Sequence, residues 1–312
     1  MKKRVLVAAA TVLALGLFGT SAASAAETVT FTSQNCSPWP VPAGVTSITI
    51  DATGAAGGTA VAGDAVPGKG DGYSGTLSHL TEGEILFVCV DMSGGAGGST
   101  LGTETAGHGG GASGVGYGTN FERPVLVAAG GGGAADQHEG FTGLGDGGNA
   151  GEAGHDGTIP NGGGAGTLTE GGEGGIGNFN NGEPGTKFSE APGMGGAGGA
   201  NIGGEPEAGA GGGGGYYGGG GGGSGKGAGG GGGGGSDFCG NGATNCEGHP
   251  QAGTSSNAGS EPGEAKVTIT YTAPGQPTFT DECKKGGWKN FGDMFQSQGQ
   301  CVRFVATGGK HG

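Results

Sequence analysis

The glycine-rich middle of this chain contains letter patterns that resemble nucleotide-binding and catalytic motifs. G-x-G-x-x-G occurs many times, but no copy joins an expected strand to an expected helix, as a dinucleotide site requires. Residues 220–226 approach a phosphate-binding loop, yet Gly227 stands where Ser or Thr must bind magnesium. G-x-S-x-G, the nucleophile motif of serine hydrolases, does not occur. The patterns therefore indicate glycine-rich backbone and predict no nucleotide cofactor.

Two histidines stand beside acids, His138 beside Glu139 and His155 beside Asp156. A catalytic pair also needs an orienting group and a pocket, so solvated loops are the simpler interpretation. Residues 143–149 resemble one calcium-binding nonapeptide turn, but such turns work in tandem arrays and only one imperfect copy is present. We expect a non-enzymatic chain with no catalytic, cofactor-binding or metal-ligating residue.

Cysteine usage indicates disulfides. The six cysteines are Cys36, Cys89, Cys239, Cys246, Cys283 and Cys301. An even number in an exported chain predicts disulfides, although six cysteines allow 15 connectivities. Proximity along the chain favours Cys239–Cys246 and Cys283–Cys301, which leaves Cys36 with Cys89. Zinc is the rival interpretation, but there is no C-x-x-C pair and the histidines are scattered.

The first 25 residues have the features of a signal peptide. Three basic residues precede an apolar run at residues 5–18, and A-x-A stands at residues 23–25. The run is too short for a membrane span. Removing residues 1–25 deletes three positive charges and no acids, which takes the net charge from −14 to −17. Such a chain lacks the basic residues that nucleic acid requires. We expect a secreted extracellular protein of bacterial type, released or held non-covalently at the cell wall.

Glycine accounts for 89 of the 312 residues, in G-G-x-G-G patterns and long runs. Collagen is excluded because glycine does not recur at every third position and proline is sparse. The composition alone favours a disordered tract. However, β-branched residues alternate or cluster at residues 28–31, 45–50, 84–90, 124–128 and 266–271, as in strands. A glycine block at residues 128–235 would then be an insertion that starts and ends at the same sheet. Many hydrogen bonds between its backbone groups would order it.

Seven stretches resemble, in their order and spacing, the glycine-rich extracellular domain of the anaplastic lymphoma kinase and leukocyte tyrosine kinase receptors, which bacterial secreted proteins share. They are VPAGVTSITI at 41–50, GAAGG at 54–58, GEILFV at 83–88, RPVLVAAGGGG at 123–133, the glycine run with two tyrosines at 211–223, the run at 229–236 with Phe238, and VTITY at 267–271. The resemblance covers about residues 28–273.

This resemblance implies an all-β fold, with a jelly-roll-like β-sandwich similar to tumour-necrosis-factor modules and an inserted bundle of polyglycine-II helices. The receptor domain binds small helical cytokines, but the ligand-contacting residues lie outside the matched stretches, so no ligand is implied here. V-A-I-K, H-R-D and D-F-G do not occur, and Phe291-Gly-Asp293 has the wrong order. The resemblance therefore implies no kinase activity.

The C-terminal residues differ in charge from the rest. After the signal peptide we expect one domain at residues 26–273, a linker at 274–277 and a small Cys283–Cys301-bridged tail at 278–312. The tail carries five positive and three negative charges, against five and 24 in residues 26–273. It is similar to a short tail that recurs on exported actinobacterial proteins.

Aromatic and basic side chains are the candidate binding residues. Trp288, Phe291 and Phe295 are spaced as a helical stripe, which would bind a wall polymer or glycan, or form a small core beneath the disulfide. Lys284, Lys285 and Lys289 would contact anionic wall polymers or remain solvated. Tyr216 and Tyr217, within pure glycine, would be exposed binding aromatics or caps on a packed glycine bundle.

Two functions follow from these expectations. The first is a non-catalytic structural or adhesive scaffold outside the cell, with the tail as a weak surface-association device. The second is a binding module that recognises a soluble protein or a glycan at the junction between sandwich and glycine block. Neither needs a cofactor.

Overall fold

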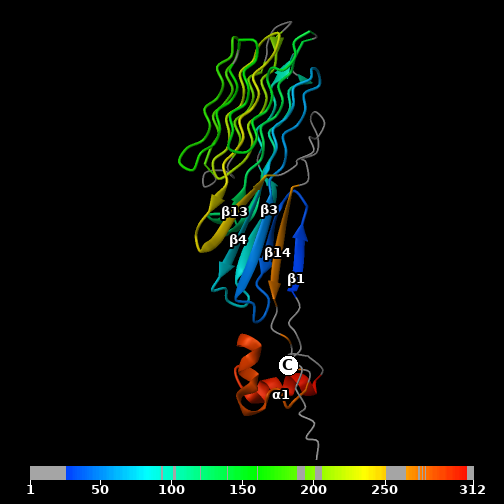
Figure 1. Ribbon diagram of the computed structural model, residues 1–312, viewed down its shortest axis with the longest axis vertical. Helices are drawn as coiled ribbons and strands as arrows, with labels where there is room; N and C mark the ends of the chain where they lie inside the picture. Colours follow the sequence, from blue (N-terminus) through cyan, green and yellow to red (C-terminus); the bar gives the residue numbers. More distant parts are fainter. Residues whose placement is uncertain are drawn as a thin grey trace, which may run out of the picture.

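The structure is a computed structural model (Figure 1). It consists of two antiparallel sheets, a block of extended glycine-rich segments and a helical C-terminal segment. It describes residues 26–307 except 93, 101–102, 120, 139, 160, 188–193, 201–205, 251–264, 273–274, 276 and 278. The expected signal peptide and part of the expected linker lie outside these residues. The described chain is thus all-β except for its C-terminal segment.

Each large sheet has five strands. The first has the order β1 (Ala26–Phe31), β14 (Lys266–Thr272), β3 (Ser47–Thr53), β4 (Asp71–Ser78) and β13 (Ala243–Pro250). The second has the order β12 (Phe238–Cys239), β9 (Arg123–Ala128), β8 (Ala112–Tyr117), β5 (Ile85–Met92) and β2 (Cys36–Pro40). Two small strand pairs, β6 (Ser99–Thr100) with β7 (Thr103–Glu104) and β10 (Pro206–Glu207) with β11 (Gly225–Lys226), lie outside them.

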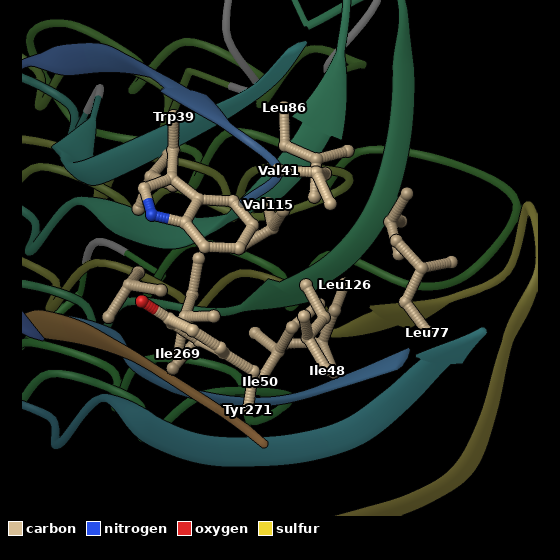
Figure 2. Packing of buried hydrophobic residues seen from close by; sticks show 14 of the residues in the cluster. Trp39, Val41, Ile48, Ile50, Leu77, Leu86, Val115, Leu126, Ile269 and Tyr271 are labelled. Atoms are coloured by element: carbon tan, nitrogen blue, oxygen red, sulfur yellow. The ribbon is translucent and has the colours of Figure 1, made fainter. Parts of the chain in front are cut away.

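The core lies between the two sheets. Alternation in β3 turns Ile48, Ile50 and Ala52 to the same face, where their register partners on β14 are also buried. Leu86, Val115 and Leu126 of the second sheet meet them, and the Trp39 and Tyr271 rings lie 5.8 Å apart in the same cluster (Figure 2). Burying each large apolar side chain contributes roughly 1.5–3 kcal/mol. This shared core holds the two sheets face to face.

Alternating patterns predicted β1, β3 and β14, and continuous apolar runs predicted β5 and β9; these strands are present. The sequence prediction missed β2, β4, β8, β12 and β13. Prolines obscure β2, an edge strand where a missing N–H is tolerated. Glycines obscure β4 and β8, because they replace side chains where sheets approach closely. A Cβ on Gly75 of β4 would lie 2.8 Å from the Leu126 side chain of the other sheet, and one on Gly114 of β8 would lie 2.2 Å from the Leu126 carbonyl oxygen on the neighbouring strand β9.

The glycine bundle is formed by residues 54–70, 94–111 and 129–236, with the gaps given above. These are the β3–β4, β5–β8 and β9–β12 connections, and all three leave the same end of the sheets (Figure 1). The third leaves β9 and returns to β12, whose Phe238 pairs with Val127 of β9. The bundle is therefore larger than the predicted block at residues 128–235, since two earlier loops join it.

Hydrogen bonds within the bundle repeat every three residues. Along residues 218–224 the N–H groups of Gly218, Gly221 and Ser224 donate to residues 186, 183 and 180 of one segment. Gly219 and Gly222 donate to residues 213 and 210 of a second segment, and Gly220 and Gly223 donate to residues 164 and 161 of a third. Residues 229–236 repeat this pattern with three other segments. Each such segment is therefore bonded on three sides.

Neighbouring bundle segments can approach each other this closely because glycine has no side chain. A Cβ on Gly232 would lie 1.9 Å from the Gly211 carbonyl oxygen, and one on Gly220 would lie 1.9 Å from that of Glu173. These neighbours are backbone atoms, so no side-chain rotation relieves the clash. The many buried N–H and C=O groups satisfy one another, as buried backbone must.

Three disulfides join Cys36 to Cys89, Cys239 to Cys246 and Cys283 to Cys301. These are the pairs that proximity along the chain favours. The first links register partners on β2 and β5. The second joins β12 of one large sheet to β13 of the other, which fastens the sheets together beside the glycine bundle. The third connects the start of η1 (Lys284–Met294), a 3-10 helix, to α1 (Gln298–Ala306).

Candidate functional site

An aromatic cluster lies where the glycine bundle meets the second sheet. The Tyr216 ring stacks on Phe238, with centroids 4.1 Å apart and planes inclined by 21°. Tyr217 packs edge-on against Tyr216 at 5.2 Å. Beneath them, buried Cys89 and Val127 form a small cluster on the face of the second sheet opposite the main core. Both tyrosines are half-buried, so they cap the bundle and also present ring surface to solvent.

Lys187 adds a positive charge to this cluster. Its Nζ lies 5.7 Å from the Tyr216 ring centroid and 5.6 Å from that of Tyr217. Its interactions with the two tyrosines raise the pKa of the partly exposed Lys187. We call Lys187, Tyr216, Tyr217 and Phe238 the aromatic platform. Sequence inspection found the two tyrosines, but nothing in the local pattern linked them to a lysine almost 30 residues away.

A polar cavity of about 420 Å³ lies elsewhere at the same junction. Its polar lining comes from Lys69, Asp71, Asn149 and Glu152. The Asn149 side chain accepts a hydrogen bond from the Lys69 N–H (2.9 Å) and donates one to Glu152 (2.8 Å). The cavity thus combines the cationic Lys69, the acids Asp71 and Glu152, and the amide of Asn149. The hydrogen bond from the Lys69 backbone N–H orients that amide. No sequence pattern pointed to it, because its residues come from three separate segments.

Asp71, which lines this cavity, meets a second carboxyl group. Asp71 begins β4, and Asp237 precedes β12 in the other large sheet. The Ala129 N–H donates to Asp237 Oδ1 (2.8 Å), while the Asp71 N–H donates to the Ala129 carbonyl (2.9 Å). Burial, and then the side-chain hydrogen bond with Asp71, raise the pKa of Asp237 to about 8. At neutral pH Asp237 is therefore mainly protonated and joins the two sheets as a hydrogen-bonded acid pair.

The C-terminal segment has a small core of its own. Phe295 is 3% exposed and packs at 5.3 Å from Phe304, beside the buried Cys283–Cys301 disulfide. The prediction of Phe295 as a surface-binding residue is therefore wrong. It lies just beyond η1 in extended conformation, so the helical stripe is interrupted. Trp288 and Phe291 are half-buried against the same core.

Three exposed lysines lie in the η1 segment that packs on this small core. Lys284, Lys285 and Lys289 are exposed, and Lys289 Nζ lies 5.6 Å from the Trp288 ring centroid. Lys284 also pairs with Asp281 at 2.6 Å, which lowers the pKa of that exposed carboxyl. The three lysines and the remaining surface of Trp288 therefore form the basic face of the tail, whose binding role stays a prediction.

The other candidate residues have structural partners. His155 Nδ1 lies 3.6 Å from Asp146 instead of pairing with its neighbour Asp156, which accepts the Gly162 N–H. Asp146 also accepts the Val66 N–H (2.7 Å), so the calcium-like turn at residues 143–149 uses this oxygen within the protein. The His138 N–H donates to the Gly227 carbonyl, and Glu139 lies outside the described residues.

The glycine sequence near Lys226 is part of the bundle. Residues 220–224 donate hydrogen bonds to other segments, and Lys226 of β11 pairs with Pro206 of β10. A second bundle segment follows at residues 228–236, where a phosphate-binding loop would need a helix. Within the described part of the chain, no three His, Cys, Asp or Glu side chains gather as a metal cluster, and no helix has the length and apolarity to cross a membrane.

No protein-family model and no curated protein matches this chain.

Proposed function

We propose that this chain is a secreted, non-catalytic scaffold with a structural or adhesive role outside the cell. The observation that carries the proposal is the three-residue hydrogen-bond repeat of the glycine bundle, in which neighbouring segments leave no room for a Cβ. An assembly held together by buried backbone bonds offers rigidity and few chemically active side chains. Three disulfides are consistent with an oxidising compartment outside the cytoplasm.

In this proposal the bundle segments are polyglycine-II helices and the two sheets form a jelly-roll-like sandwich. Polyglycine-II has three residues per turn, as polyproline II does. Three successive N–H groups therefore point to three different neighbouring segments. The resemblance to the receptor glycine-rich domains supports the same interpretation.

Adhesion would use both ends of the molecule. The bundle ends in turns furthest from the sheets (Figure 1). Phe141 packs against Gly227 and Ile176 lies beside Gly223, next to the turn at residues 224–229. The exposed large apolar side chains of the bundle are Val61, Val66, Phe141, Ile159, Ile176 and Phe179. The basic face of the tail would associate weakly with anionic polymers of the cell wall, since exposed lysines provide charge without a shaped pocket.

Cell fractionation tests this proposal. The full chain should remain in the wall fraction, and deleting residues 278–312 should release it into the medium. A full-length variant with Lys284, Lys285 and Lys289 changed to Gln separates charge from the presence of the tail, and it should be released at lower salt than the parent. Unchanged wall retention after the deletion would contradict a role for the tail.

The alternative is a binding module for a soluble protein or a glycan at the junction. The aromatic platform and the 420 Å³ cavity favour it, because half-exposed rings and convergent polar groups suit such ligands. A pulldown with the secreted chain should then recover one partner in stoichiometric amount. A Tyr217→Ala variant should lose that partner, whereas Ile85→Ala, an exposed apolar site on β5, should retain it. Failure to recover a stoichiometric partner would count against this alternative.

A further inference from the structure

The polar cavity at the junction is lined by three segments that are far apart in the sequence. Asp71 begins β4 at the end of the β3–β4 connection, and Gly248 lies on β13. Asn149 and Glu152 lie at the two ends of a turn in the β9–β12 connection. A Cβ on Gly248 would lie 3.8 Å from Asp71 Oδ2, so the missing side chain leaves space beside that oxygen.

The turn from Asn149 to Glu152 is held in place by backbone hydrogen bonds. The Glu152 N–H donates to the Asn149 carbonyl (2.8 Å), and between them Gly151 has a φ of 76°, which glycine adopts readily. The Gly151 N–H donates to the Gly235 carbonyl (2.7 Å), and the Glu152 carbonyl accepts the Gly234 N–H (2.8 Å). The turn is therefore fixed against the bundle, which lowers the entropy cost of ordering it around a ligand.

The side chains around the cavity supply both donors and acceptors. Asn149 Oδ1 accepts the Lys69 N–H and its Nδ2 donates to Glu152 Oε2, which leaves a second amide hydrogen for a ligand. Asp71 uses Oδ1 to accept the Gly72 N–H (2.8 Å). Among the described residues, Lys69 forms no ion pair with Asp71 or Glu152. The ammonium group and both carboxyl groups thus retain hydrogen-bonding capacity at the cavity.

The size and composition of the lining restrict the ligand. A volume of about 420 Å³ lies within the range of small-molecule sites, roughly 300–1,000 Å³. Among the described residues no large apolar side chain lines the cavity, which disfavours a lipid or an aromatic ligand. Two acids against one lysine disfavour an anion such as phosphate. A sugar fits, because each hydroxyl group donates and accepts at once, and Ala150 and Gly70 offer contacts for its C–H groups.

We propose that this cavity is a subsite for one sugar unit of a neutral glycan. Asp71 and Glu152 accept hydrogen bonds from the sugar hydroxyls. Lys69 and Asn149 donate hydrogen bonds to the hydroxyl oxygens. The proposal rests on the alternative function, the binding module at the junction, and names its ligand class; it places the glycan in the cavity and not on the aromatic platform.

Calorimetric titration of the full chain tests the subsite, with cellotriose, maltotriose and triacetylchitotriose as neutral probes and putrescine and inorganic phosphate as charged ones. At least one trisaccharide should bind with millimolar affinity or better, and the charged probes should not bind. Glu152→Gln should weaken that binding about tenfold, because an amide oxygen replaces a carboxylate as acceptor. Gln can still accept the hydrogen bond from Asn149, so the turn should be preserved.

Gly248→Leu should abolish binding by filling the cavity. Its Cβ would make only ordinary contacts, 3.5 Å from the Tyr73 ring and 3.8 Å from Asp71, so this variant should fold. Thr244→Leu is the matched control, since it adds the same side chain at an exposed position of β13 away from the lining. This control should bind the trisaccharide as the parent does, and both variants should keep the melting temperature of the parent.

Three results would overturn the proposal. One is that none of the trisaccharides binds the parent, whether or not putrescine does. Another is parent-like binding in Gly248→Leu and Glu152→Gln. The third is binding that is lost in Tyr217→Ala and kept in Gly248→Leu, which would move the glycan to the aromatic platform. A chain that recovers a stoichiometric protein partner but binds no trisaccharide would refute the subsite alone and leave the binding module intact.

Discussion

Single residues decide how tightly the glycine bundle packs. At Gly232 an added methyl group would meet the Gly211 carbonyl oxygen at 1.9 Å, whereas at Gly58 the nearest atom would be the His108 nitrogen at 3.2 Å. We expect Gly232→Ala to lower the free energy of unfolding by about 3 kcal/mol or more, because only backbone displacement can relieve the contact.

Gly58→Ala is the matched control, since the same methyl group needs a shift of only tenths of an ångström there. Denaturant unfolding of both variants measures the difference. Equal stability of the two variants would mean that the bundle is loose enough to absorb a methyl group at Gly232.

Asp237 gives the fold a pH dependence. Its pKa is about 8 in the folded chain against a model-peptide value of 3.8, so the folded state retains a proton that the unfolded state releases. This contribution to stability is present in full below pH 3.8 and is lost as the pH rises towards about 8. Asp237→Asn imitates the protonated acid, and it should exceed the parent in stability at alkaline pH by on the order of 2 kcal/mol.

Urea unfolding across a pH series measures this difference between variant and parent. Asp51→Asn, at an exposed position in β3, should follow the parent at every pH. A parent and an Asp237→Asn variant with parallel pH profiles would show that the acid pair does not hold the proton.

At the scale of elements, the bundle segments should behave as strongly hydrogen-bonded structure despite lacking helix or strand geometry. Successive N–H groups along residues 209–235 donate to neighbouring segments, and most of these residues are buried. We expect slow amide exchange over this region, comparable with that of β3 and β14. Hydrogen-exchange mass spectrometry measures it, and complete exchange within seconds would contradict an ordered bundle.

Strands could be predicted where apolar and polar side chains alternate along the sequence. They were missed where glycine or proline replaces those side chains. Ile48, Ile50 and Ile269 reveal their strands by alternation, whereas β4 and β8 contain glycines at their close contacts. The disulfide pairs followed from proximity. The cavity and the acid pair were hidden, because Asp71 and Asp237 come together only through the folded bundle.

At the scale of the whole molecule, the C-terminal segment has a core separate from that of the sheets. Phe295, Phe304 and the Cys283–Cys301 disulfide pack with one another, while among the described residues the main core ends at Tyr271. We expect Cys283→Ser/Cys301→Ser to destabilise the tail by about 3 kcal/mol, because the disulfide closes a short loop. The unfolding transition of the sheets and bundle should be unchanged.

Limited proteolysis and calorimetry measure the two parts independently. Cleavage should increase within residues 284–306 alone. A variant whose main transition also falls would reveal that the tail contributes to the stability of the sheets.

The distal turns of the bundle have a consequence for how such a molecule diversifies. Along each bundle pass almost any substitution of glycine collides with a neighbouring carbonyl, but the side chains of Ile159, Ile176 and Phe179 project into open solvent at the turns between passes. Substitutions are thus tolerated at the turns, while the glycine segments between the turns accept few of them. A library of peptides grafted in place of Thr158 and Ile159, which are both exposed, should be displayed on a fixed backbone, much as recognition loops are displayed on an antibody framework.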